Sequence, residues 1–181
     1  MKAIQTLSLL CVSLFLLQCG SSLPPCTTDV DCNAGKSCLG PDDAKVCVEK
    51  SNIPTDDDIC YVLVKSASLS KERDWDPIDP PEPYVTIEIP GEEKFTTSSN
   101  VSTYKPTWNE KSPSYPYKQI KQMKVILLDK DTGGTGVFRN DDDHAGTWDS
   151  KGNRWFVTNK KSHDFELTNE YVKLKIAVKC P

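Results

Sequence analysis

Tyr84-Val85-Thr86-Ile87-Glu88-Ile89 is the stretch of sequence that decides the fold class. Apolar residues alternate with more polar ones along it, and it is rich in β-branched and aromatic side chains. A period of two places one set of side chains on a buried face and the other on an exposed face, which indicates a β-strand. Pro90-Gly91 ends the run with a turn signal.

Other short runs on both sides of this stretch have the same β-rich composition. They are residues 60–65, 93–97, 123–128, 155–158 and 171–178. Clusters of Pro, Gly, Asn and Asp separate them, and no window keeps a helical period. Repeated short strands with turn signals between them predict an all-β sandwich or barrel.

The overall composition narrows the class of protein and the compartment. The chain has 181 residues, a net charge of −4 and eight cysteines. This length allows one ordinary domain with small additions. The acidic balance argues against nucleic acid as a partner, because a phosphate-binding surface needs clustered Lys and Arg. The cysteine content indicates an oxidising compartment.

The N-terminus has the features of an export signal. Lys2 precedes an apolar stretch, 7–17, that has the length of a signal-peptide core. It is too short to cross a hydrocarbon layer of about 30 Å. We therefore interpret residues 1–18 as a signal peptide; the alternative is a buried helix of the folded domain.

The end of this segment resembles a bacterial lipobox. In Leu16-Leu17-Gln18-Cys19, Leu16 and Cys19 match that pattern, whereas Gln18 stands where a small residue is usual. The resemblance implies that Cys19 is lipidated and becomes the first residue of the mature protein. A plain secretory cut after Ser22 is the competing interpretation, and it gives a secreted protein instead of a membrane-anchored lipoprotein.

After a spacer, 19–25, comes a cysteine-rich segment, 26–50, and then a linker, 51–58. The segment contains too few apolar residues for a core, so disulfides must replace one. It resembles small EGF-like modules, and the working pairing joins Cys26 with Cys38 and Cys32 with Cys47. Four cysteines allow three pairings, and the sequence alone does not choose among them. A zinc site is the alternative, although the segment lacks a His and a Cys-x-x-Cys pair.

Two further cysteines lie at the ends of the β-rich region. Cys60 opens its first run and Cys180 closes its last. If the first and last strands are neighbours, these residues form a disulfide that ties the ends of the domain together. Two unpaired buried thiols are the alternative.

Four motifs follow one another within residues 59–181. They are Asp76-Pro77-Ile78-Asp79-Pro80-Pro81-Glu82-Pro83-Tyr84-Val85, Tyr104-Lys105-Pro106-Thr107-Trp108-Asn109-Glu110, Val125-Ile126-Leu127-Leu128-Asp129-Lys130-Asp131 and Asn140-Asp141-Asp142-Asp143-His144-Ala145-Gly146. In this order and spacing the set resembles a C2 domain. The resemblance implies an eight-stranded antiparallel C2-type β-sandwich and a non-catalytic module that binds calcium and phospholipid.

The acidic loops favour a calcium site on chemical grounds as well. Calcium takes six to eight oxygen ligands at about 2.3–2.6 Å, chiefly from carboxylates and carbonyls. Carboxylates that converge on one point repel one another and need a cation. Lys71, Arg73 and Lys130 lie near these loops and allow partial neutralisation. The alternative is that the acids form Asx-turns and solvated loop tips.

The resemblance also implies the ligands. Asp76 and Glu82 match the first loop, and Asp129, Asp131 and Asp143 match the third, with Asp142 in place of Asp143 if the register slips by one residue. Glu82 stands where the family usually has Asp. An EF-hand starting at Asp129 is excluded, because its twelfth residue, Asn140, is not Glu and a strand precedes it.

Apolar residues at the loop tips complete the expected membrane site. They are Trp75, Ile78, Val137 and Phe138. By resemblance they contact lipid; the alternative is that they pack the loops against the sandwich. The expected partner is anionic membrane lipid. The alternatives are a calcium-stabilised module for a protein partner at the cell envelope and an accessory domain of a hydrolytic complex.

The sequence gives little support to an enzyme. The chain has two histidines, and it contains neither a Gly-x-Ser-x-Gly elbow nor a His-Glu-x-x-His motif.

Overall fold

The computed structural model describes residues 24–40, 45–73, 75, 80–99, 102–130, 142–150, 155 and 157–181. The predicted signal peptide and the candidate lipidation residue Cys19 lie outside these ranges. In the described part of the chain, no helix is long and apolar enough to cross a membrane.

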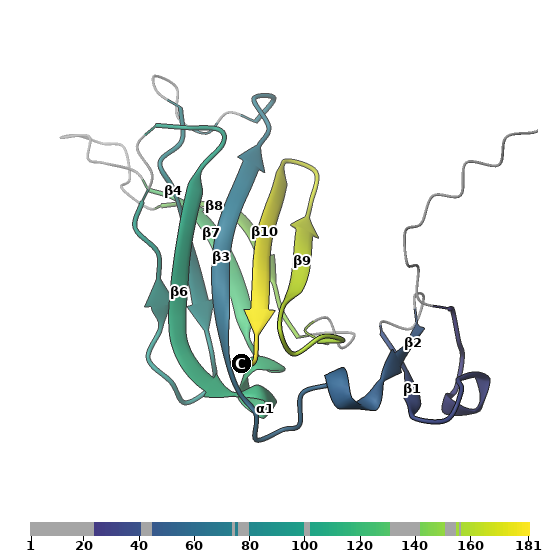
Figure 1. Cartoon of the computed structure of the whole chain (residues 1–181). Coiled ribbons are helices and arrows are strands. Elements are labelled where there is room, and N and C mark those ends of the chain that lie inside the picture. Colours follow the sequence, from purple (N-terminus) through teal and green to yellow (C-terminus); the bar gives the residue numbers. More distant parts are fainter. Residues whose placement is uncertain are drawn as a thin grey trace, which may run out of the picture.

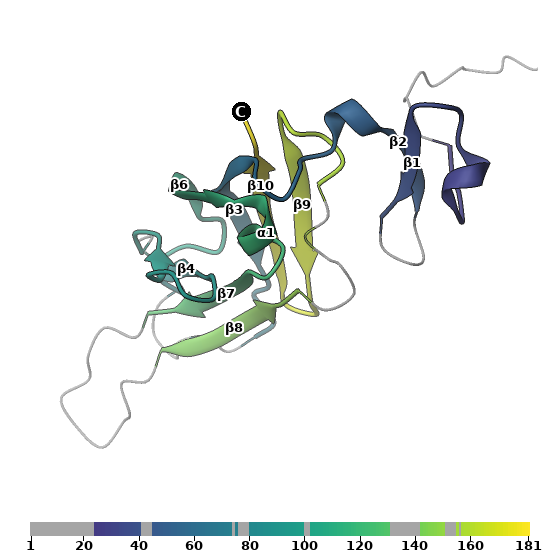
Figure 2. The ribbon, with the colours of Figure 1, turned by 90° about the horizontal axis from the view of Figure 1, so that it is seen from below.

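Two four-stranded antiparallel sheets pack face to face (Figures 1 and 2). The first has the order β6-β3-β10-β9, formed by Thr107–Pro116, Ile59–Leu69, Val172–Lys179 and His163–Thr168. The second has the order β5-β4-β7-β8, formed by Phe95–Thr96, Pro83–Glu88, Lys124–Asp129 and Asp143–Trp148. A single-turn helix, α1 (Tyr117–Ile120), connects β6 to β7. The predicted eight-stranded antiparallel sandwich is confirmed.

The core lies between the two sheets and is built by the alternation that the sequence predicts. In β4, Val85 and Ile87 are buried, and they face buried residues of the other sheet such as Val62 and Val64 of β3. Burying such a face excludes apolar surface from water and is the main favourable contribution to folding.

One predicted strand is not a strand. Trp155 and Val157 lie in a turn and an irregular segment, yet both are almost completely buried. The indole N–H of Trp155 donates to the carbonyl oxygen of Met123 at 2.6 Å. The Tyr117 hydroxyl donates to the Trp155 carbonyl at 3.2 Å and accepts from the Val157 N–H at 2.8 Å. Side-chain contacts therefore replace the ladder that the β-rich composition predicted.

The cysteine-rich segment forms a small hairpin, β1 (Lys36–Leu39) paired with β2 (Val46–Glu49), flanked by the 3₁₀ turns η1 (Asp29–Asp31) and η2 (Lys50–Asn52). Disulfides join Cys26 to Cys38 and Cys32 to Cys47, as in the working pairing. The sulfur atoms of Cys26, Cys32 and Cys38 lie within 4.8 Å of one another. Because these sulfurs form disulfides, they are not the thiolates that zinc requires.

The third disulfide joins Cys60 to Cys180, and both cysteines are buried. It ties the start of β3 to the residue after β10, at the lower end of the sandwich in Figure 1. The cysteine-rich segment lies beside the same end, where the Lys160 N–H donates to the Asn52 carbonyl at 2.8 Å. The described strand ends that flank the acidic segments, at Pro83, Asp129 and Asp143, are at the opposite end.

Gly146, in the last of the four motifs, lies within β8 at a point where no side chain fits. A Cβ there would lie 2.7 Å from the ring of Trp148 and 2.8 Å from Nδ2 of Asn169. Neither neighbour is free to move, because the Trp148 indole donates to the Thr168 carbonyl at 3.3 Å and Asn169 Nδ2 donates to the Ala145 carbonyl at 2.9 Å. The glycine is required for close packing.

We therefore expect Gly146→Ala to destabilise the domain by about 1–3 kcal/mol, the usual range for overpacking a filled core. Urea unfolding followed by tryptophan fluorescence measures this change. Gly91→Ala controls for backbone strain without overpacking, since a Cβ there meets nothing within 4 Å and only the positive φ of 83° opposes the substitution. A Gly146→Ala protein as stable as the wild type would contradict this packing requirement.

Candidate functional site

The start of β4, the end of β7 and the start of β8 lie together at one edge of the second sheet, the upper edge in Figure 1. In the register, Pro83 at the start of β4 pairs with Asp129 at the end of β7, which in turn pairs with Asp143 at the start of β8. The connections between β3 and β4 and between β7 and β8 both leave from this edge. The topology thus brings the first and fourth motifs beside the end of the third.

Asp129 is the most buried of the candidate ligands, with 2% of its surface exposed. Its Oδ1 atom accepts a hydrogen bond of 2.6 Å from the backbone N–H of Glu82. The Lys130 N–H in turn donates to the Glu82 carbonyl at 3.2 Å. These bonds hold the candidate ligand Glu82 next to the end of β7.

Asp143 lies directly opposite Asp129 in the antiparallel ladder. Side chains in such a pair lie on the same face with Cβ atoms about 5 Å apart, and two like charges there destabilise the sheet. Among the described residues, the carboxylates of Glu82 and Asp143 have no hydrogen-bond or ion-pair partner. The carboxylates of Glu82 and Asp143 are therefore available to a further ligand.

Asp142 is positioned differently, because it accepts a hydrogen bond from the Tyr84 hydroxyl. Burial and the neighbouring Asp142 carboxylate raise the pKa of Tyr84 to about 12, so the phenol keeps its proton and donates. The two residues line a cavity of about 290 Å³ together with Thr96, Thr97, Ser99 and Lys130. Of the two alternative ligands, Asp143 is thus the one that faces Asp129.

Arg73, beside the first loop, contacts both Trp75 and the backbone of β8. Its guanidinium lies 4.2 Å from the centre of the Trp75 ring, and Nη2 donates to the His144 carbonyl at 2.9 Å. This contact links the β3–β4 connection to β8. Neither the Arg73 bridge nor the Tyr84–Asp142 bond is predicted by the sequence.

The prediction that Trp75 contacts a membrane is wrong. Only 5% of its surface is exposed, and its indole N–H donates to the Ser70 carbonyl at 2.7 Å. The side chain packs the first loop against the sandwich, which was the alternative interpretation. The other predicted membrane contacts, Ile78, Val137 and Phe138, lie outside the described residues.

We expect Trp75→Phe to keep an aromatic ring here but to lose the bond to Ser70 and part of the buried surface. The lost bond alone should cost about 1 kcal/mol of stability, the usual net value of a neutral hydrogen bond, and the vacated space adds to that cost. Chemical denaturation measures this cost, and vesicle binding at a temperature well below the melting point should be unchanged. A selective loss of vesicle binding with full stability would restore Trp75 as a lipid contact.

The candidate ligands are described only in part, because Asp76 and Asp131 lie outside the described residues. Within the described ranges, no three carboxylates each bring an oxygen within 4.8 Å of the others. The donor chemistry nevertheless fits calcium, since Glu82, Asp129 and Asp143 offer only oxygen atoms at one edge of the sheet.

A model of the C2 domain family matches residues 59–164. The chain belongs to the C2 domain family. C2 domains are typically non-catalytic modules that commonly bind calcium and membrane phospholipid. The four motifs and the eight-stranded sandwich are therefore those of a C2 domain preceded by a disulfide-linked segment.

Solved structures of other C2 proteins are similar to this chain at low sequence identity. Human GIVD cytosolic phospholipase A2, in complex with an inhibitor and terbium chloride, is 20% identical, with a TM-score of 0.49 over 67% of this chain and 17% of that one. A C2 domain of plant Extended Synaptotagmin 1 is 15% identical, with a TM-score of 0.47 over 69% and 95%. The calcium-bound pair of C2 domains of Extended-Synaptotagmin 2 is 16% identical, with a TM-score of 0.49 over 70% and 46%. No curated protein sequence matches the chain.

Proposed function

We propose that this protein is a non-catalytic module that binds anionic phospholipid surfaces in a calcium-dependent manner through the Asp129–Asp143 end of its C2 domain. The observation that carries the proposal is the pairing of two aspartates directly across the β7–β8 ladder. Such a pair is costly by itself and becomes favourable when a cation lies between the loops.

The chain's own residues supply the ligands and their positions. Asp129 and Asp143 present carboxylates from two paired strands, and the backbone bonds between Glu82 and the end of β7 fix the first loop beside them. Asp76 and Asp131 complete the proposed ligand set. Bound calcium supplies the positive charge that lets these acidic loops approach an anionic membrane, which would otherwise repel them.

We also propose that the protein is exported and anchored by lipid at Cys19. The three disulfides support export, because such bonds persist in oxidising compartments. Mass spectrometry of the mature protein tests the anchor, with a lipid-modified Cys19 as the expected N-terminus. An unmodified Leu23 N-terminus would contradict it and favour the secreted form.

Co-sedimentation of the soluble chain, residues 24–181, with vesicles tests the calcium-dependent function. Vesicles of phosphatidylcholine with phosphatidylserine should bring down the protein in millimolar calcium and leave it in the supernatant in chelator. An Asp129→Asn, Asp143→Asn variant should stay in the supernatant in both conditions. If the wild type never sediments although calcium raises its melting temperature, the lipid function is wrong and a calcium-stabilised module for a protein partner at the envelope takes its place.

A further inference from the structure

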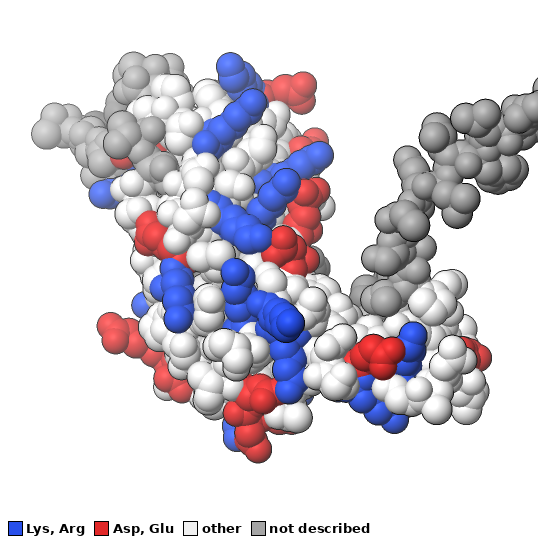
Figure 3. Space-filling model, viewed as in Figure 1, with Lys and Arg blue, Asp and Glu red and all other residues white. Residues whose placement is uncertain are grey.

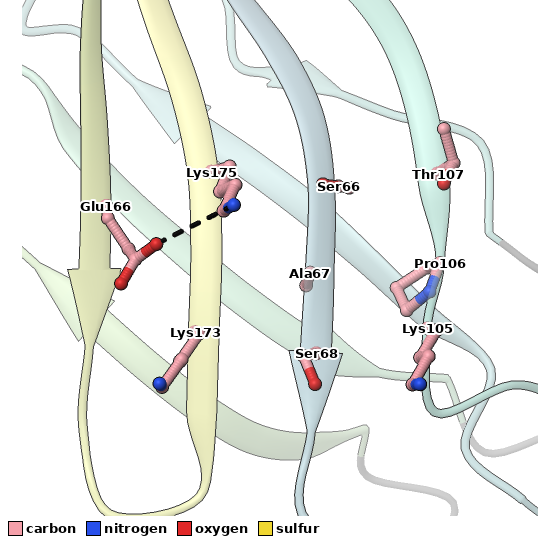
Figure 4. A pocket seen from close by; sticks show the side chains of 9 residues that line it. All are labelled: Ser66, Ala67, Ser68, Lys105, Pro106, Thr107, Glu166, Lys173 and Lys175. Atoms are coloured by element: carbon pink, nitrogen blue, oxygen red, sulfur yellow. Dashed lines mark ion pairs between the residues drawn. The ribbon is translucent and has the colours of Figure 1, made fainter.

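The exposed face of the β6-β3-β10-β9 sheet contains a groove of about 440 Å³. Figure 4 shows the side chains that line it, on four neighbouring strands or just before them. They are Ser66, Ala67, Ser68, Lys105, Pro106, Thr107, Glu166, Lys173 and Lys175. None of these residues is among the five proposed calcium ligands, although Lys105, Pro106 and Thr107 belong to the second motif.

The strand register explains the hollow. Lys173 and Lys175 of β10 point outward because Val172, Leu174 and Ile176 between and beside them are buried. Across the ladder they pair with Ser68 and Ser66 of β3, whose side chains are short. Long side chains on β10 beside short ones on β3 leave an open floor between the strands.

The charges in the groove are unevenly matched. Lys175 Nζ lies 3.8 Å from Glu166 Oε2, the carboxylate that Figure 4 draws beside it. Across the described ranges, the amino groups of Lys105 and Lys173 have no hydrogen-bond or ion-pair partner. Two cations therefore remain unmatched on a surface that also offers the hydroxyls of Ser68 and Thr107.

Two other lysines on the same face are already engaged, although Figure 3 shows basic side chains along much of it. Lys65 Nζ forms an ion pair with Asp164 Oδ1 at 2.7 Å. Lys111 Nζ lies 3.9 Å from the centre of the Tyr61 ring. Lys179, at the far end of β10, also has no hydrogen-bond or ion-pair partner among the described residues, but it lies outside the groove, which brings two such lysines together.

We propose that this groove binds the phosphate group of an anionic lipid head group and forms a second membrane contact, independent of calcium. A phosphate monoester has three acceptor oxygens and up to two negative charges, which lysine ammonium groups and hydroxyls complement. Ser66, Ser68 and Thr107 line the groove as well, and their hydroxyl groups can donate to phosphate oxygens.

The position of the groove identifies a membrane lipid as the source of the phosphate. Lys105 lies two residues before the start of β6, and Lys173 pairs with Ser68 one position from the start of β10 and the end of β3. These strand ends lie at the same end of the sandwich as the end of β7 and the start of β8, which are Asp129 and Asp143 (Figure 1). The inference therefore rests on the proposed function, because a membrane that meets the acidic loops lies close to the groove.

The test uses the soluble chain and two vesicle compositions of matched surface charge, phosphatidylcholine with phosphatidic acid and phosphatidylcholine with phosphatidylserine. Phosphatidic acid carries the phosphate monoester. In chelator, the wild type should bind the phosphatidic acid vesicles more tightly. Lys105→Gln, Lys173→Gln should weaken that binding about 25-fold, since one lysine near an anionic surface changes affinity about fivefold.

Two variants control for net charge. Lys118→Gln, Lys161→Gln removes the same charge at the opposite end of the domain and should change binding much less. Glu166→Gln removes the one carboxylate among the described residues that line the groove and should tighten binding several-fold. If the groove binds phosphate, the affinity for phosphatidic acid vesicles should rise in Glu166→Gln and fall in Lys105→Gln, Lys173→Gln.

If the Lys105, Lys173 variant and the Lys118, Lys161 variant lose affinity equally, the groove is not the binding site and only non-specific electrostatic attraction remains. Equal binding to the two vesicle types would overturn recognition of the monoester. If inorganic phosphate at submillimolar concentration removes the lysine-dependent binding, a soluble phosphate is the ligand and the lipid source is wrong. Calcium-dependent binding to phosphatidylserine vesicles is measured separately, so its failure would refute the proposed function and not the groove.

Discussion

Asp143→Asn should melt at a higher temperature than the wild type in chelator and at a lower temperature in saturating calcium. Without calcium, Asp143 faces Asp129 across the ladder and the two like charges repel. Removing one charge relieves this repulsion, which is worth about 0.2–1 kcal/mol for a cross-strand pair. With calcium, the same substitution removes a ligand.

The loss in calcium should be larger than the gain in chelator. A ligand at about one hundred times its Kd stabilises the folded state by about 2.7 kcal/mol. For a domain of this size, that corresponds to a rise in Tm of about 10 °C in the wild type, most of which the variant should lack.

Differential scanning fluorimetry in calcium and in chelator measures both changes in melting temperature. Asp57→Asn is the matched control, because it removes a carboxylate at the far end of the domain whose side chain is 91% exposed. The control should behave as the wild type does in both conditions. A variant less stable than the wild type in chelator as well would mean that Asp143 has a structural role that does not depend on calcium.

Removal of the Cys60–Cys180 disulfide should destabilise the C2 domain by about 4–5 kcal/mol. The bond closes a loop with a sequence separation of 120 residues, and the chain-entropy model assigns about 4.7 kcal/mol to a loop of about 100 residues. Both cysteines are buried, so their loss also removes apolar contacts from the core. Urea unfolding of Cys60→Ala, Cys180→Ala under oxidising conditions measures the change.

The control for this prediction is Cys26→Ala, Cys38→Ala, which opens a loop with a sequence separation of only 12 residues outside the sandwich. It should leave the urea midpoint of the C2 domain nearly unchanged. If the two double variants lower that midpoint equally, the Cys60–Cys180 bond is not what closes the sandwich.

Local pattern was sufficient to predict much of the fold. The alternation in 84–89 follows directly from one buried sheet face, and the four motifs follow from the loops and strands of the C2 family. Cys60 and Cys180 pair because β3 and β10, the first and last strands of the sandwich, are neighbours. The strand predicted at 155–158 was wrong because Trp155 and Val157 are buried by long-range contacts to Met123 and Tyr117, which no local window contains.

The site was predictable to the extent that its residues are acidic and near strand ends. The sequence could not choose between Asp142 and Asp143, because the choice depends on the β7–β8 register and on the bond from Tyr84. It also could not place Trp75, since an aromatic side chain in a polar loop suits a membrane or a buried pocket equally. The groove was missed, although the alternating Val172-Lys173-Leu174-Lys175 was a visible sign of a basic strand face.

Isothermal titration of calcium into the chelator-stripped chain tests most directly whether the acidic end of the sandwich holds the ion. We expect saturable binding that disappears in the Asp129→Asn, Asp143→Asn variant and persists in Asp57→Asn. Absence of saturable binding to the wild type at millimolar calcium, or equal binding to the wild type and the Asp129→Asn, Asp143→Asn variant, would contradict the calcium site.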